Sequence, residues 1–418
     1  MALLSARSLN SFLQVFGILV FVTTIVCIYF VYISDITTPK HFIVRYTNTS
    51  IHENGQRRKI LLAFYYWEQF TMATNNFLQL TALAAYGGRQ VVVPFAKNSH
   101  FSGVNIINGY EPLDRYYNVT ELSNLLRLHG YATLIDWEQF KNVCKGKLDI
   151  LVHFDYEGNK EHWNTSFTAP YSPCKHRNHR NGSLKKRNYG FDIVHQICVD
   201  VSFLTSVEKF EEEVLGGLPC VGIWEWRGAS TRSSYRTKFD LSSMVRSELS
   251  YRNVSLFLSS KLLRIAAHFI KNAIGGEFIA LHIRSEHMLK AGKDIATVKK
   301  CLLNLTSRVK AICKQKNMVH FRVFLATDFN KFGSSSKMVE QARKHAQSLM
   351  ETMVFLGPVT FKPEHYRLTD NGEVAITEMT ILTSGKYLIV MGGGSFQNWV
   401  VAQFHSKKNG NYVERFAC

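Results

Sequence analysis

Short apolar runs alternate with longer amphipathic segments over most of the chain. The first run, "KILLAFYY" at 59–66, has the composition of a buried strand, and the segment 67–88 carries apolar residues at helical spacing. That segment ends at two glycines, and a Val-rich run at 89–93 follows and stops at Pro94. The pattern predicts a strand, a helix and a strand, and such a unit implies a parallel sheet with a right-handed crossover.

The second half of the chain shows the same alternation. A helical pattern at 257–276 leads into an apolar strand at 278–283, and the last predicted strand is the glycine-ended run at 387–394. Between them the pattern predicts helices at 296–316, 335–353 and 373–384 and strands at 321–328 and 359–361. This order predicts an open, doubly wound α/β sheet, in which ligands bind at the carboxyl ends of the strands.

One apolar segment is too long for a buried strand or core helix. Phe12 to Ile33 is a run of roughly 22 residues without a charge, enough to cross a bilayer core of about 30 Å as a helix. A cleaved signal peptide is the alternative, but the expected shorter apolar core and small-residue cleavage site are missing. We therefore expect a membrane-spanning signal anchor.

The flanking charges do not orient this anchor, because basic residues lie on both sides of it. N-glycosylation sequons give the orientation, since every one of them follows the span. They begin at Asn48, Asn118, Asn164, Asn181, Asn253 and Asn304. We expect a single-pass type II protein of the Golgi or ER membrane, with its C-terminal part in the lumen.

The length of 418 residues exceeds what a single core usually fills, so two α/β domains are expected. The composition, 46% hydrophobic and 20% charged, is that of a folded protein. The predicted organisation is a cytoplasmic tail at 1–11, the anchor at 12–33, a stem at 34–58, an N-terminal domain at 59–250 and a C-terminal domain at 251–418.

Seven of the eight cysteines follow the anchor, where an oxidising lumen favours disulfide bonds. Cys301 and Cys313 lie on one predicted helix, about 18 Å apart at about 1.5 Å per residue, so they cannot pair with each other. An odd number also leaves at least one cysteine without a partner in the chain. No zinc-binding spacing of Cys or His occurs.

The formal net charge of +18 is concentrated partly in the polar segment 175–187. A solvated surface loop is the favoured interpretation of that segment. A lumenal domain is not expected to bind nucleic acid, whereas so positive a surface is compatible with an anionic glycan or a phosphate-bearing ligand.

Three predicted strands end in groups suited to a negatively charged ligand. The strand at 278–283 runs through His282 into Arg284, the strand at 321–328 ends at Asp328, and the last strand ends in Gly392 to Phe396. Parallel strands bring these ends to one edge. Arginine grips phosphate through two parallel hydrogen bonds, and a glycine turn before a helix exposes backbone amides to an anion. The combination predicts a pocket for a nucleoside diphosphate.

The segments "FIALHIRSEH", "VFLATDF" and "EMTILTSGKYLIVMGGGSFQNWV" resemble the C-terminal half of GDP-fucose-dependent fucosyltransferases, especially protein O-fucosyltransferases. The resemblance is best over 251–404. It implies a GT-B fold, with two Rossmann-like domains facing a cleft, and transfer of fucose from GDP-fucose. It implies that Arg284 holds the donor pyrophosphate, that His282 lies beside the nucleotide, and that Asp328 is on the guanosine side. The phosphates would contact Gly393, Gly394, Ser395 and Phe396.

The N-terminal half departs from the Gly-rich Asn-Gln segment of many members, because this chain has "YWEQFTMATNN" there. The segment resembles the Gly-Glu-x-Phe form of another branch, with Glu68 and Phe70 at matching positions. In that branch the glutamate is proposed as general base, so Glu68 becomes the catalytic candidate. The alternative is an acid placed at a helix start by the macrodipole.

No Asp-x-Asp motif occurs, so no metal site or cofactor is expected, and Arg284 would stabilise the leaving nucleotide diphosphate instead. The expected activity is metal-independent, inverting transfer to a hydroxyl of a glycoprotein or glycan. Two alternatives remain: an inactive membrane-anchored module that binds glycans or proteins, and a related transferase with another nucleotide sugar. The segment 222–228 predicts a buried strand with Trp224 and Trp226 on one face, after which Arg227 could approach a ligand.

Overall fold

The computed structural model describes residues 58–104, 109–155, 171–173, 191–200, 206–228, 256–284, 288, 292–316, 321–327, 351–407 and 412–417. All of them lie in one compact unit, Arg57–Cys418. Among these residues, no helix is long and apolar enough to cross a membrane. The expected anchor at 12–33, Asp328 and the sequons at Asn48, Asn164, Asn181 and Asn253 lie outside the described residues and remain predictions.

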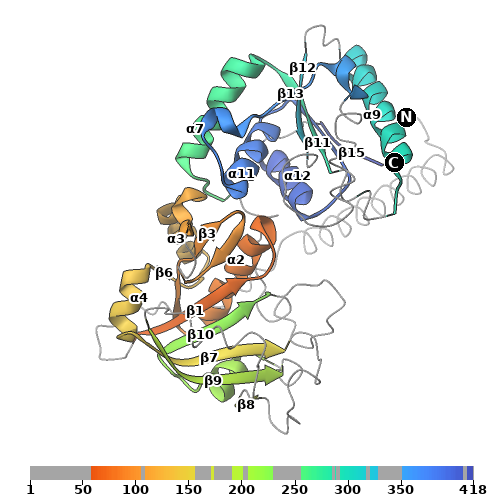
Figure 1. Ribbon diagram of the computed structural model, residues 1–418. Helices are drawn as coiled ribbons and strands as arrows, with labels where there is room; N and C mark the ends of the chain where they lie inside the picture. Colours follow the sequence, from red (N-terminus) through yellow and green to blue (C-terminus); the bar gives the residue numbers. More distant parts are fainter. Residues whose placement is uncertain are drawn as a thin grey trace, which may run out of the picture. The chain divides into compact units, whose positions relative to one another are not determined.

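The N-terminal sheet has seven strands in the order β6-β2-β1-β10-β7-β9-β8 (Figure 1). Their bounds are β1 Lys59–Tyr66, β2 Arg89–Val92, β6 Leu134–Ile135, β7 Lys147–Asp155, β8 Tyr171–Pro173, β9 Asp192–Asp200 and β10 Cys220–Trp226. Every pairing is parallel except that of β8 with β9. Helix α2 (Phe70–Tyr86) joins β1 to β2, which confirms the predicted strand, helix and strand.

Smaller elements complete this half of the described chain. β3 (Phe95–Lys97), β4 (His100–Ser102) and β5 (Glu111–Pro112) form an antiparallel sheet of three strands. The helical elements are η1 Leu113–Arg115, α3 Val119–Leu128, α4 Trp137–Cys144, α5 Val207–Lys209 and the π-helical η5 Phe210–Val214. Asp136 caps α4 in a capping box with Gln139, which explains why that helix begins at Trp137.

The C-terminal sheet has five strands in the order β13-β12-β11-β14-β15, and all of them are parallel. The strands are β11 Phe278–Ile283, β12 Arg322–Thr327, β13 Val359–Thr360, β14 Tyr387–Met391 and β15 Tyr412–Phe416. The helices are α7 Ser260–Phe269, continued by the π-helical η6 Ile270–Ile274, then α9 Ile295–Gln315, α11 Asn371–Leu382 and α12 Ser395–Lys407. Short 3-10 turns occur at η7 Val354–Leu356 and η8 Pro363–Tyr366. The edge strand β15 was not predicted from the sequence.

Both faces of this sheet are covered by helices. Ile279, Leu281 and Ile283 of β11 pack in one cluster with Val298 and Leu302 of α9. The alternate residues Phe278 and Ala280 belong to the other cluster, which contains Ile376 of α11 and Trp399 of α12. The alternation of side chains along β11 therefore separates two helical layers, as a doubly wound fold requires.

The alternation of side chains between the two faces of the sheet breaks at the ends of β1 and β10. Trp224 contacts Phe64, whereas Trp226 contacts Phe154 in a different cluster, so the prediction that both tryptophans share a face is wrong. The indole N–H of Trp226 donates to the backbone oxygen of Asn76 on α2 at 2.7 Å. A buried indole needs such an acceptor, which explains the turn of Trp226 toward α2.

The cysteines follow the prediction as far as they are described. Cys144 and Cys220 form a disulfide between the end of α4 and the start of β10. Cys301 is disulfide-bonded and Cys313 is a free, buried thiol, which confirms that these two do not pair with each other. Burial raises the pKa of the Cys313 thiol to about 11, so the thiol is protonated and unreactive at neutral pH.

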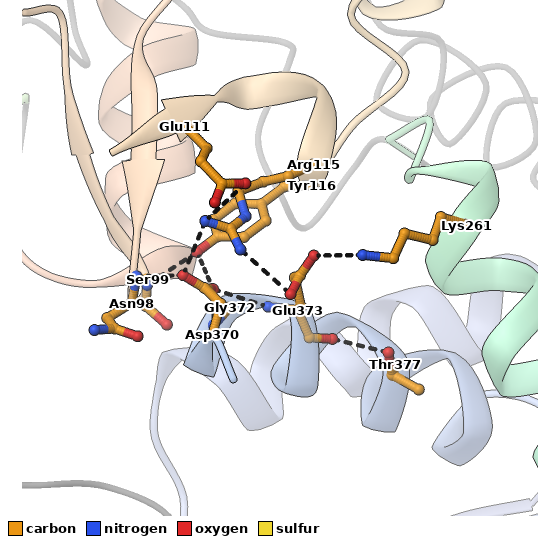
Figure 2. A network of polar contacts seen from close by, with 10 residues as sticks. All are labelled: Asn98, Ser99, Glu111, Arg115, Tyr116, Lys261, Asp370, Gly372, Glu373 and Thr377. Carbon is orange, nitrogen blue, oxygen red and sulfur yellow. Dashed lines mark hydrogen bonds and ion pairs between the residues drawn. The ribbon is translucent and has the colours of Figure 1, made fainter. Parts of the chain in front are cut away.

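A buried polar cluster joins α11 to the β3–β4 turn and to η1 (Figure 2). One carboxylate oxygen of Asp370 caps α11 by accepting the amide of Gly372 at 2.8 Å and also accepts the hydroxyl of Tyr116. The other accepts the amide of Asn98 at 2.6 Å and lies 3.5 Å from Arg115. Burial, and then the charge of Asp370, raise the pKa of Tyr116 strongly. One carboxylate thus satisfies donors separated by more than 250 residues in the chain.

Replacing Asp370 with alanine is expected to lower the free energy of unfolding by about 3–5 kcal/mol, because Arg115 and the Tyr116 hydroxyl lose their buried acceptor. Glu111→Ala is the matched control, since Glu111 pairs with the same arginine but its side chain is 59% exposed. The control is expected to lose at most about 1 kcal/mol. Chemical denaturation measures both, and equal losses in the two variants would contradict this role for Asp370.

Candidate functional site

The candidate site lies at the carboxyl ends of β11 and β14 in the C-terminal sheet. Ile283 pairs with Met391, and the amide of Arg284 donates to the carbonyl oxygen of Met391 at 2.9 Å. This bond keeps Arg284 beside Gly392, the first residue after β14. The sheet register therefore brings the arginine and the glycine triplet together, as the sequence predicts.

Two of the three glycines cannot carry a side chain without moving Arg284. Gly392 has φ +107, and a Cβ there would lie 2.3 Å from the carbonyl oxygen of Arg284. Gly394 has φ +111, and a Cβ there would lie 2.0 Å from Nη1 of Arg284. Backbone angles in this range are also strained for residues with a Cβ. The absence of side chains thus lets the half-buried guanidinium lie directly against the turn.

The turn after β14 opens into the N-terminus of α12. The backbone amides of Gly394, Ser395 and Phe396 make no hydrogen bond to any described residue, and the helical ladder starts with Asn398 donating to Gly394. These amides are the orphan donors of a helix start, where the helix dipole also favours negative charge. With the cation of Arg284 beside them, they form an arrangement that can bind an anion.

Gln397 holds this turn in shape, and the sequence analysis missed it. Its side-chain oxygen accepts the amide of Gly393 at 2.6 Å. Its amide nitrogen donates to the carbonyl oxygens of Met391, at 2.6 Å, and His282, at 3.3 Å. The side chain is almost fully buried, so these bonds are shielded from water. A glutamine four residues after a glycine in a turn was the only sequence signal for this role.

The other predicted donor-side residues lie on the α12 side of the sheet. His282 is buried, and its ring lies 5.3 Å from the ring of Phe396. The structure therefore brings six of the predicted donor-side residues together in one place: His282, Arg284, Gly393, Gly394, Ser395 and Phe396. Asp328 directly follows Thr327, the last described residue of β12, and stays a prediction.

A small hollow lies beside this turn. It has a volume of about 270 Å³ and is lined by Gly392, Gly393 and Gln397 together with Lys293 and Arg415. Val390 and Met391, consecutive residues of β14, also line it, so the hollow lies at the carboxyl end of that strand. Its two cations add to the positive charge around the turn.

Glu68 lies in the turn between β1 and α2. Its φ is +67, a left-handed value that costs a residue with a Cβ about 1–2 kcal/mol. The half-buried residue precedes Phe70, the first residue of α2, so it is not part of the helix itself. Strain of this kind at a non-glycine residue is typical of functional sites, and it motivates a functional role for Glu68.

His100 contacts the same turn. Partial burial of the imidazole lowers its pKa below the ordinary value, while a hydrogen bond to the backbone of Glu68 acts in the opposite direction. A lowered pKa keeps the ring neutral at pH 7. The imidazole that contacts the backbone of Glu68 is therefore uncharged at neutral pH.

An aromatic stack connects the turn of Glu68 with α12. We call the arrangement of Arg284 and the amides at the start of α12 the anion cradle. Phe70 at the start of α2 stacks on Trp399 of α12, with ring centroids 4.9 Å apart and an interplanar angle of 28°. Both side chains are buried. This contact links the two candidate regions, although they lie far apart in the chain.

The described residues contain no group of three or more His, Cys, Asp or Glu side chains that could hold a metal ion. Of the predicted sequons, Asn118 and Asn304 are described, and both are exposed. The side-chain oxygen of Asn118 caps α3 by accepting the amide of Glu121. Glycosylation of both remains a prediction.

Comparison with known proteins finds similarity in structure alone. No family model matches the chain, and no curated protein matches it in sequence. The apo form of POFUT1 matches with a TM-score of 0.51 and 12% identity, over 88% of this chain and 100% of that one. POFUT1 in complex with GDP-fucose matches with a TM-score of 0.50 and 12% identity, over 87% and 99% of the two chains. The chain thus has a fucosyltransferase-like α/β fold, which confirms the predicted resemblance.

Proposed function

We propose that this protein is a glycosyltransferase that moves fucose from GDP-fucose to a hydroxyl of a glycoprotein or glycan. The observation that carries the proposal is the contact of the Arg284 guanidinium with Gly394, beside the amides of Ser395 and Phe396. That arrangement suits a diphosphate, which offers several anionic oxygens to one arginine and one helix start. The fold shared with POFUT1, whose complex with GDP-fucose has been solved, supports the choice of donor.

The proposal includes the organisation of the whole chain. The two parallel sheets would belong to two Rossmann-like domains, 59–250 and 251–418, that face a cleft as in GT-B enzymes. A helix at 12–33 would anchor the protein as a type II protein of the Golgi or ER membrane. The length and the lack of charge of that segment support this part of the proposal.

In the proposed reaction the acceptor hydroxyl oxygen forms a bond to the anomeric carbon of fucose. The bond from that carbon to the β-phosphate oxygen breaks, and GDP leaves with the bonding electron pair. Glu68 accepts the hydroxyl proton as general base. Attack on the face opposite the leaving group inverts the configuration. Arg284 and the amides at the start of α12 stabilise the charge that develops on the diphosphate.

GDP binding tests the donor half of this proposal. We expect calorimetry to show that the wild-type protein binds GDP, and that Arg284→Ala loses binding by at least about 30-fold, because an arginine that grips a diphosphate contributes about 2 kcal/mol or more. Gly394→Ala should weaken binding by about tenfold or more, because its methyl group displaces the guanidinium. Gly276→Ala is the matched control, with φ +145 and no atom near the added methyl group.

Unchanged affinity in Gly394→Ala would contradict the proposed cradle. If the wild-type protein binds UDP but does not bind GDP at millimolar concentration, GDP-fucose is not the donor, and another nucleotide sugar takes its place in the proposal.

Replacing Glu68 with glutamine tests the catalytic half. The variant keeps the size of the side chain but cannot accept a proton, so kcat should fall by about 10²–10⁴-fold while the Kd for GDP stays unchanged. Glu138→Gln, an exposed glutamate on α4, serves as the control and should leave kcat unchanged. Labelled GDP-fucose with a panel of glycans and folded domains provides the assay. Full activity of Glu68→Gln would remove Glu68 from the mechanism, and no transfer by the wild type would favour a binding module.

Chelation tests the metal-independent part. Because Arg284 and backbone amides are proposed to neutralise the leaving diphosphate, EDTA should leave the initial rate of donor hydrolysis or transfer unchanged. Added manganese should then give no stimulation. Loss of activity with the chelator and recovery with manganese would contradict this mechanism.

A further inference from the structure

Trp67 is a large aromatic side chain that remains exposed immediately before Glu68. The residue comes directly after the last residue of β1 and is 37% exposed. The neighbouring residues Tyr66 and Phe70 are buried, as is Trp226 at the end of the paired strand. An indole left in solvent between buried neighbours is a candidate for contact with a ligand.

The backbone of Trp67 is fixed from two directions. Its amide donates to the carbonyl oxygen of Trp226 at 2.9 Å, and its own carbonyl oxygen accepts from the side chain of Asn76 at 3.0 Å. Asn76 is itself buried and accepts the indole N–H of Trp226 through its backbone oxygen. Elements β1, α2 and β10 therefore all hold Trp67 in place.

The ring of Trp67 is fixed as well. The guanidinium carbon of Arg227 lies 4.0 Å from the ring centroid, in cation–π contact with one face. Arg227 is in turn bonded to Glu225 at 3.1 Å. The indole is therefore a fixed plane with the guanidinium of Arg227 on one face and with part of its surface open to solvent. A surface fixed before binding loses little conformational entropy when a ligand arrives.

We propose that Trp67 is an acceptor subsite, on which a hexopyranose ring of the acceptor glycan stacks. The apolar C–H face of a pyranose matches the exposed part of the indole plane, and the half-buried carboxylate of Glu225 is a nearby acceptor for its hydroxyl groups. The inference rests on the proposed function and narrows its acceptor to a saccharide. Trp67 and Glu68 are consecutive residues, so the proposed subsite and the proposed general base lie in the same turn after β1.

The arrangement favours a sugar over an extended peptide. Extended peptides commonly bind by pairing with a free sheet edge. The backbone of Trp67 offers no free edge, because its amide donates to Trp226 and its carbonyl oxygen accepts from Asn76. The indole offers a flat stacking surface in place of backbone partners.

The test uses binding of simple sugars to the full-length chain in detergent micelles, loaded with GDP. Saturation-transfer NMR is recorded with the methyl β-glycosides of N-acetylglucosamine, galactose, glucose and mannose. We expect at least one of them to bind the wild type, and Trp67→Ala to weaken that binding by about tenfold or more. Trp67→Tyr, which keeps an aromatic plane, should retain most of it. Phe257→Ala removes an aromatic side chain of similar exposure, 42%, and should change nothing.

Each outcome decides between the possibilities. Equal sugar binding by the wild type and Trp67→Ala, or no sugar binding by the wild type at tens of millimolar, would overturn the subsite. If GDP still binds in that case, the proposed function stands and only the subsite fails. In transfer assays Trp67→Ala should raise the KM for a glycan acceptor more than it lowers kcat, while the Kd for GDP stays constant. If Trp67→Ala raises the KM for a protein acceptor that carries no sugar by the same factor, that result would also contradict a saccharide subsite.

Discussion

The contact between Arg284 and a glycine turn is the constraint on which the candidate site depends. Pairing of β11 with β14 places the two segments side by side, and the bond from Arg284 to Met391 prevents them from separating. The guanidinium then occupies the space that a side chain at Gly394 would need. A fixed cation, a bare backbone and a helix start thus meet at the carboxyl edge of a parallel sheet, where α/β folds bind their ligands.

The surrounding packing supports that contact from several sides. Gln397 fixes the turn from within, through a buried side chain that bonds to both strands. Trp399, two residues later, stacks on Phe70 and so connects the anion cradle with the turn that carries Glu68. Asp370 caps α11, which leads into β14, and also bonds to Tyr116 and Asn98 from the first half of the chain. Binding groups and catalytic candidates are therefore held by buried contacts, which is what preorganisation requires.

The sequence predicted those features that follow from local pattern. Alternation of apolar runs with amphipathic helices gave the parallel strands, and strand ends then identified Arg284, His282 and the glycine turn as neighbours. Contacts between distant residues had no such signal. Asp370 and Tyr116 are too far apart in the chain for any periodicity to relate them, and the left-handed turn at Glu68 depends on bonds from β10 and α2 to its neighbour. The face of Trp226 was predicted wrongly because its indole N–H follows an acceptor on α2 and not the strand alternation.

The central claim is that Arg284 and the amides of α12 hold the diphosphate of a nucleotide donor. A crystal structure of the chain with GDP tests it most directly. The account predicts phosphate oxygens within hydrogen-bond distance of the Arg284 guanidinium and of the amides of Ser395 and Phe396. A diphosphate bound elsewhere, for example only by Lys293 and Arg415 in the neighbouring hollow, would contradict it.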